Sequence, residues 1–161
     1  MLKLKDFNLE LFNINNEKHN KLKEDIIGMK DSDLISKNID AYIKRNEDLG
    51  EVDNITRTYV VIHDNNYIGL TFVNYYPEEV INGKKYSEEI EIGLGILPEF
   101  RNKGLGSSLE KELSEKLLEE FPRFRFIVAK TDDDNLPSIK ASEKAGFKRT
   151  IDNEYHYERE N

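Results

Sequence analysis

The segment 88–106 places a glycine-containing loop between a strand pattern and a long amphipathic helix, and this junction constrains the fold more than any other part of the chain. Residues 88–97 alternate isoleucine or leucine with glutamate or glycine, which predicts a β-strand with one apolar face. The helix expected over 104–121 carries one stripe of leucines, with glutamate and lysine on the rest of its surface. This junction favours an α/β (α+β) domain.

The loop between the strand and the helix has the residues expected of an anion-binding site. The first N–H groups of a helix lack partners within the helix and lie at the positive end of its dipole. Glycines let the backbone approach a phosphate closely, and arginine and lysine add positive charge. A glycine-containing loop with two solvated cations is the alternative explanation of the same pattern. The candidate anion-binding residues are Arg101, Asn102, Lys103, Gly104, Leu105, Gly106 and Ser107.

Other phosphate-binding motifs fit this segment less well. A Walker loop requires Gly-Lys followed by Ser or Thr after four free positions, and the chain contains no such run. The run 104–109 (GLGSSL) lacks the third glycine of a dinucleotide fingerprint and does not directly follow its strand. These differences argue against a P-loop protein and against a dinucleotide-binding protein.

The hydrophobic pattern of the rest of the chain predicts one domain over residues 1–161. The length fits a single domain, and the four prolines are scattered, so no linker is indicated. In order, the pattern predicts a strand, two helices, three strands, a helix, a strand, a helix and two strands. The first strand is expected over 2–12, the second helix is expected to end near Gly50, and 76–87 is expected to contain turns.

A second segment, 135–147, completes a pattern typical of one protein family. An asparagine can cap a short helix that carries Pro137 in its first turn and ends at Gly146. With the Arg-x-x-Gly-x-Gly spelling of 101–106 before it, the chain resembles the GNAT superfamily of N-acetyltransferases. The Asn-x-x-Ser and Glu-Lys-Ala-Gly-Phe spellings are similar to the branch that acetylates ribosomal-protein N-termini and small amines. The motifs lie within residues 88–150, and the first fifty residues match only in outline.

The resemblance implies a GNAT fold, in which one mixed, mostly antiparallel sheet of about seven strands is flanked by about four helices. It implies acetyl-CoA as co-substrate, with the pyrophosphate bound at the loop 101–106. It also implies that the pantetheine arm enters a gap between the strands 88–97 and 123–130, where a backbone N–H stabilises the thioester oxygen. The donor-binding residues that it implies beyond the loop are Leu94, Ile96, Asn135 and Ser138.

An amine acceptor must lose a proton before it attacks a thioester, because a simple alkylammonium has a pKa of about 10.4. Glu91 is predicted as the base, directly or through water, since it shares a strand face with Gly93 and Gly95. Glu89 is the second candidate, and a solvated strand face is the alternative explanation for both glutamates. Many family members carry a tyrosine that protonates the departing thiolate. This chain has Ser142 at that position, which makes Ser142 a weaker candidate acid.

Charge and composition narrow the expected partners. The formal net charge of −8 disfavours nucleic acid and anionic membranes and suits a cationic amine, although solubility alone also explains it. The chain has no cysteine, and its three histidines show no metal-ligand spacing, so no catalytic metal is predicted. The first residues contain no apolar run typical of a signal peptide, so a cytoplasmic location is expected.

These observations together predict acetyl transfer from acetyl-CoA to a primary amine in a ternary complex. The acceptor is a small-molecule amine or a peptide N-terminus: a polyamine, an aminoglycoside, an amino acid and a peptide all stay open. The alternative is a non-catalytic acyl-CoA-binding module of the same fold, which the serine at position 142 motivates. The resemblance also allows a homodimer.

Overall fold

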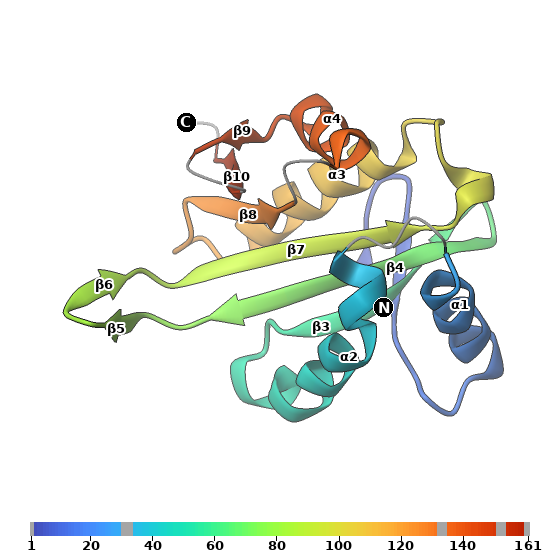
Figure 1. Cartoon of the computed structure of the whole chain (residues 1–161), viewed down its shortest axis with the longest axis horizontal. Helices are drawn as coiled ribbons and strands as arrows, with labels where there is room; N and C mark the ends of the chain where they lie inside the picture. The colour runs from blue at the N-terminus through green and yellow to red at the C-terminus, as the bar shows by residue number, and fades with distance from the viewer. Residues whose placement is uncertain (1, 30–33, 132–134, 151–153, 160–161) are drawn as a thin grey trace.

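The computed structural model describes residues 2–29, 34–131, 135–150 and 154–159, and it has a mixed α/β architecture (Figure 1). Its strands are β1 Leu2–Lys3, β2 Asn8–Leu11, β3 Arg57–His63, β4 Asn66–Tyr76, β5 Glu79–Ile81, β6 Lys84–Tyr86, β7 Glu89–Ile96, β8 Phe126–Lys130, β9 Lys148–Arg149 and β10 Glu154–Glu158. Within the described residues, eight strands form one sheet in the order β1-β2-β3-β4-β7-β8-β10-β9. The remaining pair, β5–β6, forms a ribbon that projects from one end of the molecule.

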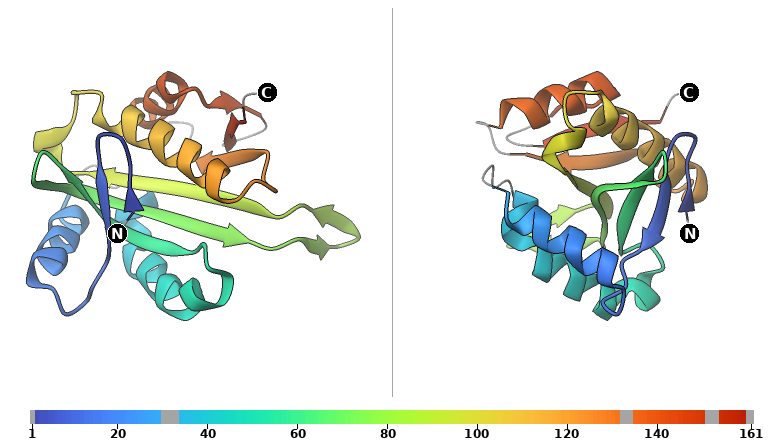
Figure 2. Two further views of the ribbon diagram at one scale, coloured as in Figure 1. Left: turned by 180° about the vertical axis from the view of Figure 1, so that it is seen from behind. Right: turned by 90° about the vertical axis from the view of Figure 1, so that its right-hand side faces the viewer.

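Two helices cover each face of this sheet. The helices of the described residues are α1 Glu17–Ile27, α2 Leu34–Asp53, α3 Leu105–Glu120 and α4 Leu136–Ala145, with a short 3₁₀ turn at Pro98–Phe100. Helices α1 and α2 lie on one face, and α3 and α4 lie on the other (Figure 2). Each face has its own apolar cluster. The cluster on the α1–α2 side contains Leu70 and Phe72, and the cluster on the α3–α4 side contains Leu109 and Leu113 of α3. The predicted fold is therefore confirmed.

Strand β7 separates its side chains between these two layers. Ile90, Ile92 and Ile96 lie in the cluster beneath α3 and α4. Because successive side chains of a strand point to opposite faces, Glu89, Glu91 and the two glycines of β7 face the α1–α2 side. The predicted alternation of this strand is correct.

The pairing of β7 with β8 is parallel and short. It consists of two residue pairs, Glu91–Val128 and Ile92–Ala129, whereas β4 and β7 pair along the whole of β7. In the described part of the chain, residues 93–96 continue beyond this ladder without a partner on the β8 side. The sheet therefore opens between β7 and β8, at the end of β7 that leads into α3.

The expectation of one strand over 2–12 is wrong. The chain turns back after Lys3, and the Leu4 N–H donates to the Phe7 carbonyl at 2.9 Å. The turn is also held from outside, since the Asp6 N–H donates to Glu112 Oε1 at 2.8 Å. The apolar–polar alternation shifts by one residue at Lys5-Asp6, where two polar residues follow each other, and the prediction of one strand did not take this break into account.

Two other boundaries differ from the sequence prediction. Helix α2 continues past Gly50 to Asp53, and Asn54 adopts the left-handed conformation after it (φ 63°). Gly50 instead allows close approach of Arg57, whose guanidinium donates to the Gly50 carbonyl. The segment 76–87 is expected to contain turns, and it forms the β5–β6 ribbon around one tight turn at Asn82-Gly83.

Candidate active site

The opening between β7 and β8 presents backbone donors. The Leu97 N–H donates to the Ile68 carbonyl of β4 at 2.8 Å, and N–H directions alternate along a strand paired in this way. The N–H groups of Leu94 and Ile96 therefore point away from β4, toward the opening. The Ile96 carbonyl agrees with this alternation, because it also points away from β4 and accepts from Arg101 Nε at 3.0 Å. A carbonyl oxygen placed in the opening can accept from these two N–H groups.

Directly after this opening, the loop leads into the amino terminus of α3. Gly104 takes the left-handed conformation (φ 76°) at the N-cap, where no side chain caps the helix. The first helical hydrogen bond runs from the Ser108 N–H to the Gly104 carbonyl at 3.1 Å. The N–H groups of Leu105, Gly106 and Ser107 are thus left for a ligand at the positive end of a sixteen-residue helix. The loop thus leads into a helix start, as the sequence predicts, and its role as an anion site stays a prediction.

A lysine from α4 adds charge to this loop. A side chain added to Gly104 would place its Cβ 3.3 Å from Lys144 Nζ, so the ammonium lies beside the loop. Lys103 is exposed and lies over the Phe100 ring, with its Nζ 5.8 Å from the ring centroid. Asn102, which is also exposed, adopts a positive φ of 63°. The loop therefore offers an anion the backbone N–H groups of the helix start and two lysine ammonium groups, those of Lys103 and Lys144.

Arg101 is turned toward the protein rather than toward the loop. Its Nε donates to the Ile96 carbonyl at 3.0 Å, and its Nη2 lies 3.2 Å from the sulfur of Met29. The guanidinium thus joins the end of β7 to the second residue after α1. In this structure Arg101 shapes the end of the opening, and its predicted contact with a pyrophosphate stays a prediction.

We expect Arg101→Ala to lower the thermal stability of the protein without any ligand present. The Ile96 carbonyl would lose a charged donor, which typically costs about 1–2 kcal/mol. Differential scanning calorimetry measures this as a fall of several degrees in Tm. Lys103→Ala is the matched control, because its side chain is exposed, and equal Tm losses in the two variants would contradict the structural role.

Helix α4 brings two further predicted residues close to each other. The Asn135 side chain caps this helix by accepting from the Ser138 N–H at 3.3 Å. The side-chain oxygen of Asn135 is therefore used for capping. Gly146 ends the helix in the left-handed conformation, as the sequence predicts (φ 105°).

Glu91 is 9% exposed and forms an ion pair with the end of β8. Its Oε2 lies 3.2 Å from Lys130 Nζ, which also lies 3.4 Å from Glu89 Oε1. Although burial by itself lowers the pKa of Lys130, the charges of Glu91 and Glu89 outweigh it and raise that pKa above its ordinary value. The two candidate bases thus share one counter-ion.

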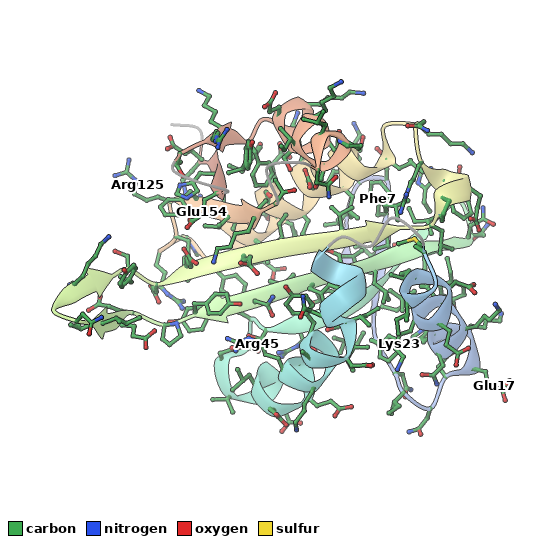
Figure 3. The ribbon with its side chains drawn as sticks, in the orientation of Figure 1. Phe7, Glu17, Lys23, Arg45, Arg125 and Glu154 are labelled. Carbon is green, nitrogen blue, oxygen red and sulfur yellow. The ribbon has the colours of Figure 1, made fainter. Side chains whose placement is uncertain are left out.

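On this side of the sheet, the ring of Tyr76 from β4 lies against two cations, Lys130 of β8 and Arg45 of α2. The Tyr76 ring lies beneath Lys130, whose Nζ is 5.4 Å from the ring centroid, and beneath Arg45, whose Cζ is 4.7 Å from it. Arg45 is labelled in Figure 3, and its Nη2 donates to the Tyr75 carbonyl at 2.9 Å. The surroundings of Glu91 therefore come from three strands and from α2.

Ser142 lies in the interface between α3 and α4. It is 2% exposed, and its Oγ donates to Glu110 Oε1 of α3 at 3.2 Å. The hydroxyl is therefore directed toward α3 in this structure. Its role as acid for a departing thiolate stays a prediction.

The sequence reasoning did not single out Lys130, Lys144 or Glu110. Lys144 belongs to the Glu-Lys-Ala-Gly-Phe spelling, so its position carried a signal, whereas the place of Lys130 at the end of a strand indicated no role. Glu110 follows Ser107 by three residues and precedes Ser114 by four, which places all three on one helix face. That face was expected to be solvated, and the structure buries it.

The described residues contain neither a metal-ligand cluster nor a membrane-spanning helix. Within the described ranges, histidine, aspartate and glutamate do not gather in a group of three or more that could hold a metal ion. None of the helices in the described part of the chain is long and apolar enough to span a membrane.

The chain matches the model of the Acetyltransferase (GNAT) family over residues 20–147. Comparison with curated protein sequences gives no match. Among solved structures, it is similar to the Salmonella typhimurium acetyltransferase that modifies the N-terminal serine of ribosomal protein L7/L12 (TM-score 0.69, 16% identity, 97% of this chain and 96% of that one).

Two structures with a bound coenzyme are also similar. The aminoglycoside acetyltransferase AAC(6')-Ib in complex with coenzyme A gives a TM-score of 0.64 at 18% identity and covers 95% of both chains. The Campylobacter jejuni N-acetyltransferase PseH in complex with acetyl-CoA gives a TM-score of 0.58 at 19% identity, over 93% of this chain and 95% of that one. The family match spans most of the sequence and the fold agrees with it, so the protein belongs to the GNAT family of acetyltransferases.

Proposed function

We propose that this acetyltransferase transfers the acetyl group of acetyl-CoA to a primary amine by direct attack in a ternary complex. The observation that carries the proposal is the position of the helix α3 amino terminus directly after the opening between β7 and β8. An anion site and an oxyanion site then lie at the two ends of one path. Coenzyme A in two of the similar structures supports the choice of donor.

The donor would bind along this path. The pyrophosphate accepts from the N–H groups of Leu105, Gly106 and Ser107, and Lys144 supplies charge beside Gly104. The pantetheine arm enters the opening, and Asn135 and Ser138 flank it from the start of α4. The thioester oxygen accepts from the N–H of Leu94 or Ile96. Donors fixed in this way stabilise the oxyanion more than water does, because they need no reorientation during the reaction.

The acceptor would approach from the α1–α2 side, where Glu91 and Glu89 lie. A neutral amine attacks the thioester carbon, and the new C–N bond forms as the carbonyl π electrons move to the oxygen. The C–S bond then breaks when this oxyanion re-forms the carbonyl, and the thiolate leaves. The amine proton passes to Glu91, directly or through water, and the thiolate takes a proton from water or from Ser142. The formal net charge of −8 favours a cationic acceptor, such as a polyamine, an aminoglycoside or a peptide N-terminus.

Glu91→Gln is expected to lower kcat by about 100-fold, because general-base catalysis contributes about 10²–10⁴-fold. The amide keeps the size of the side chain and cannot take a proton. Turnover is measured as free-thiol release from acetyl-CoA with spermidine, an aminoglycoside and a serine-initiated peptide.

Glu89→Gln is the matched control, since it makes the same change on the same strand face and also faces Lys130. A loss confined to Glu89→Gln would transfer the role of base to Glu89. Equal rates in both variants and in the wild type would remove both glutamates from the chemistry. A wild type that binds acetyl-CoA and turns over none of these amines would instead favour the non-catalytic module.

A further inference from the structure

Helix α3 has a second buried face, which is polar. Ser107, Glu110 and Ser114 are 7%, 7% and 0% exposed, and they lie on the side of α3 that meets α4. The apolar stripe that contains Leu109 and Leu113 faces the sheet instead. Two helices that pack only by apolar contact need no such groups, and burying them is costly unless they are hydrogen-bonded.

Two side-chain hydrogen bonds attach α4 to the first two turns of α3. Ser107 Oγ donates to the Ala141 carbonyl at 3.0 Å, and Ser142 Oγ donates to Glu110 Oε1 at 3.2 Å. Two residues further along α4, Lys144 Nζ lies beside Gly104. The position of α4 on α3 therefore sets the position of this cation at the loop.

Glu110 is an unusual group for this interface. The Oε2 atom of its carboxyl is buried and has no hydrogen-bond partner. Burial raises the pKa of Glu110 to about 8, and the hydrogen bond from Ser142 offsets only part of that increase. At neutral pH the carboxyl is mainly protonated.

The described elements packed on α3 offer Glu110 no counter-charge. From α4 it faces Ser142, while the charged residues of that helix, Lys140, Glu143 and Lys144, are exposed. From β7 and β8 the side chains beneath α3 are apolar, such as Ile92 and Ile127. On β10, the Tyr157 hydroxyl donates to Glu115, another residue of α3. An ionised Glu110 would therefore be a buried charge with one hydroxyl as its partner.

We propose that the uncharged carboxyl of Glu110 is a positioning element, which holds α4 against the donor loop and thereby keeps the donor site assembled. This inference rests on the proposed function. When Glu110 ionises, its carboxylate must reach water, and it can do so only if α4 moves away from α3. Lys144, Asn135 and Ser138 move with α4, so acetyl-CoA loses contacts at its pyrophosphate and along its arm.

The test is the affinity for acetyl-CoA as a function of pH, measured by titration calorimetry between pH 7 and pH 9. If only the protonated form is competent, the apparent Kd of the wild type rises about 10-fold by pH 9, in proportion to the loss of that form. Glu110→Gln keeps the size and cannot ionise, so its Kd should stay constant over this range.

Glu115→Gln is the control on the same helix, since its side chain is exposed, and it should follow the wild-type profile. A purely structural role of Glu110 would change Kd by the same factor at every pH, and that result would overturn the proposal. A wild-type Kd that does not change with pH would do the same. Should Glu110→Gln fail to fold, Glu110→Met provides a second side chain that cannot ionise. A wild type that binds no acetyl-CoA at pH 7 would overturn the proposed function, and the positioning role with it.

Discussion

Gly104→Glu is expected to weaken acetyl-CoA binding at least 100-fold. The substitution places a carboxylate at the amino terminus of α3, where the N–H groups of the first turn would receive the pyrophosphate. Two unit charges about 4 Å apart near a protein surface repel by about 4 kcal/mol, which is more than a 100-fold change in Kd. The new carboxylate also lies beside Lys144 and would pair with it, which removes that cation from the donor. Titration calorimetry at pH 7 measures the effect.

The matched control is Gly83→Glu in the β5–β6 turn. Gly83 has nearly the same backbone conformation (φ 80°, compared with 76° at Gly104), and among the described residues no heavy atom beyond its chain neighbours lies within 4 Å of an added Cβ. Both variants therefore carry the same left-handed strain, about 1–2 kcal/mol for a residue with a side chain. Only Gly104→Glu should lose the donor. Retained affinity in Gly104→Glu would place the donor elsewhere and would falsify the proposed site.

Gly69→Ala is expected to reduce the free energy of unfolding by about 3 kcal/mol, at the upper end of overpacking effects. A Cβ at Gly69 would lie 2.1 Å from the carbonyl oxygen of Gly95 in the neighbouring strand. This oxygen is a backbone atom and cannot rotate away as the end of a side chain can, so β4 and β7 would have to separate. Because a typical domain is stable by about 5–15 kcal/mol, this loss should be plain in urea unfolding.

Gly106→Ala provides the comparison for this prediction. An added Cβ there meets Leu94 Cδ1 at 3.8 Å, an ordinary contact, and the position lies in the first turn of α3. Alanine is the better helix former by about 1 kcal/mol, so stability should be unchanged or slightly higher. If Gly69→Ala were as stable as Gly106→Ala, the close approach of β4 and β7 would be wrong.

The sequence predicted those features that depend on neighbours along the chain. The helix cap at Asn135, the helix stop at Gly146 and the two-faced strand 88–97 all follow from local hydrogen bonding and from side-chain period. The loop 101–106 was placed correctly for the same reason, because a glycine-containing segment before a leucine stripe marks a helix start. The residue roles within that loop are still proposals.

Features that depend on contacts between distant segments were not predicted. Arg101 reads as a free cation in the sequence, and only the fold brings the Ile96 carbonyl and Met29 to it. Glu110 reads as a surface residue, because nothing in α3 reveals that α4 covers that face. Lys130 becomes informative only when the parallel pairing places β8 beside Glu91.

The short ladder between β7 and β8 is also a seam of few backbone hydrogen bonds in the middle of the sheet. Strands β2, β3, β4 and β7 are joined by antiparallel ladders of four or more residue pairs, and β8 and β10 pair along all of β8, yet two residue pairs join β7 to β8. Local opening at this seam breaks few hydrogen bonds, so amide hydrogens of β8 should exchange by a sub-global route. A ligand seated across the seam would fasten both strands and slow that exchange, so the donor would act as a structural tie as well as a reactant.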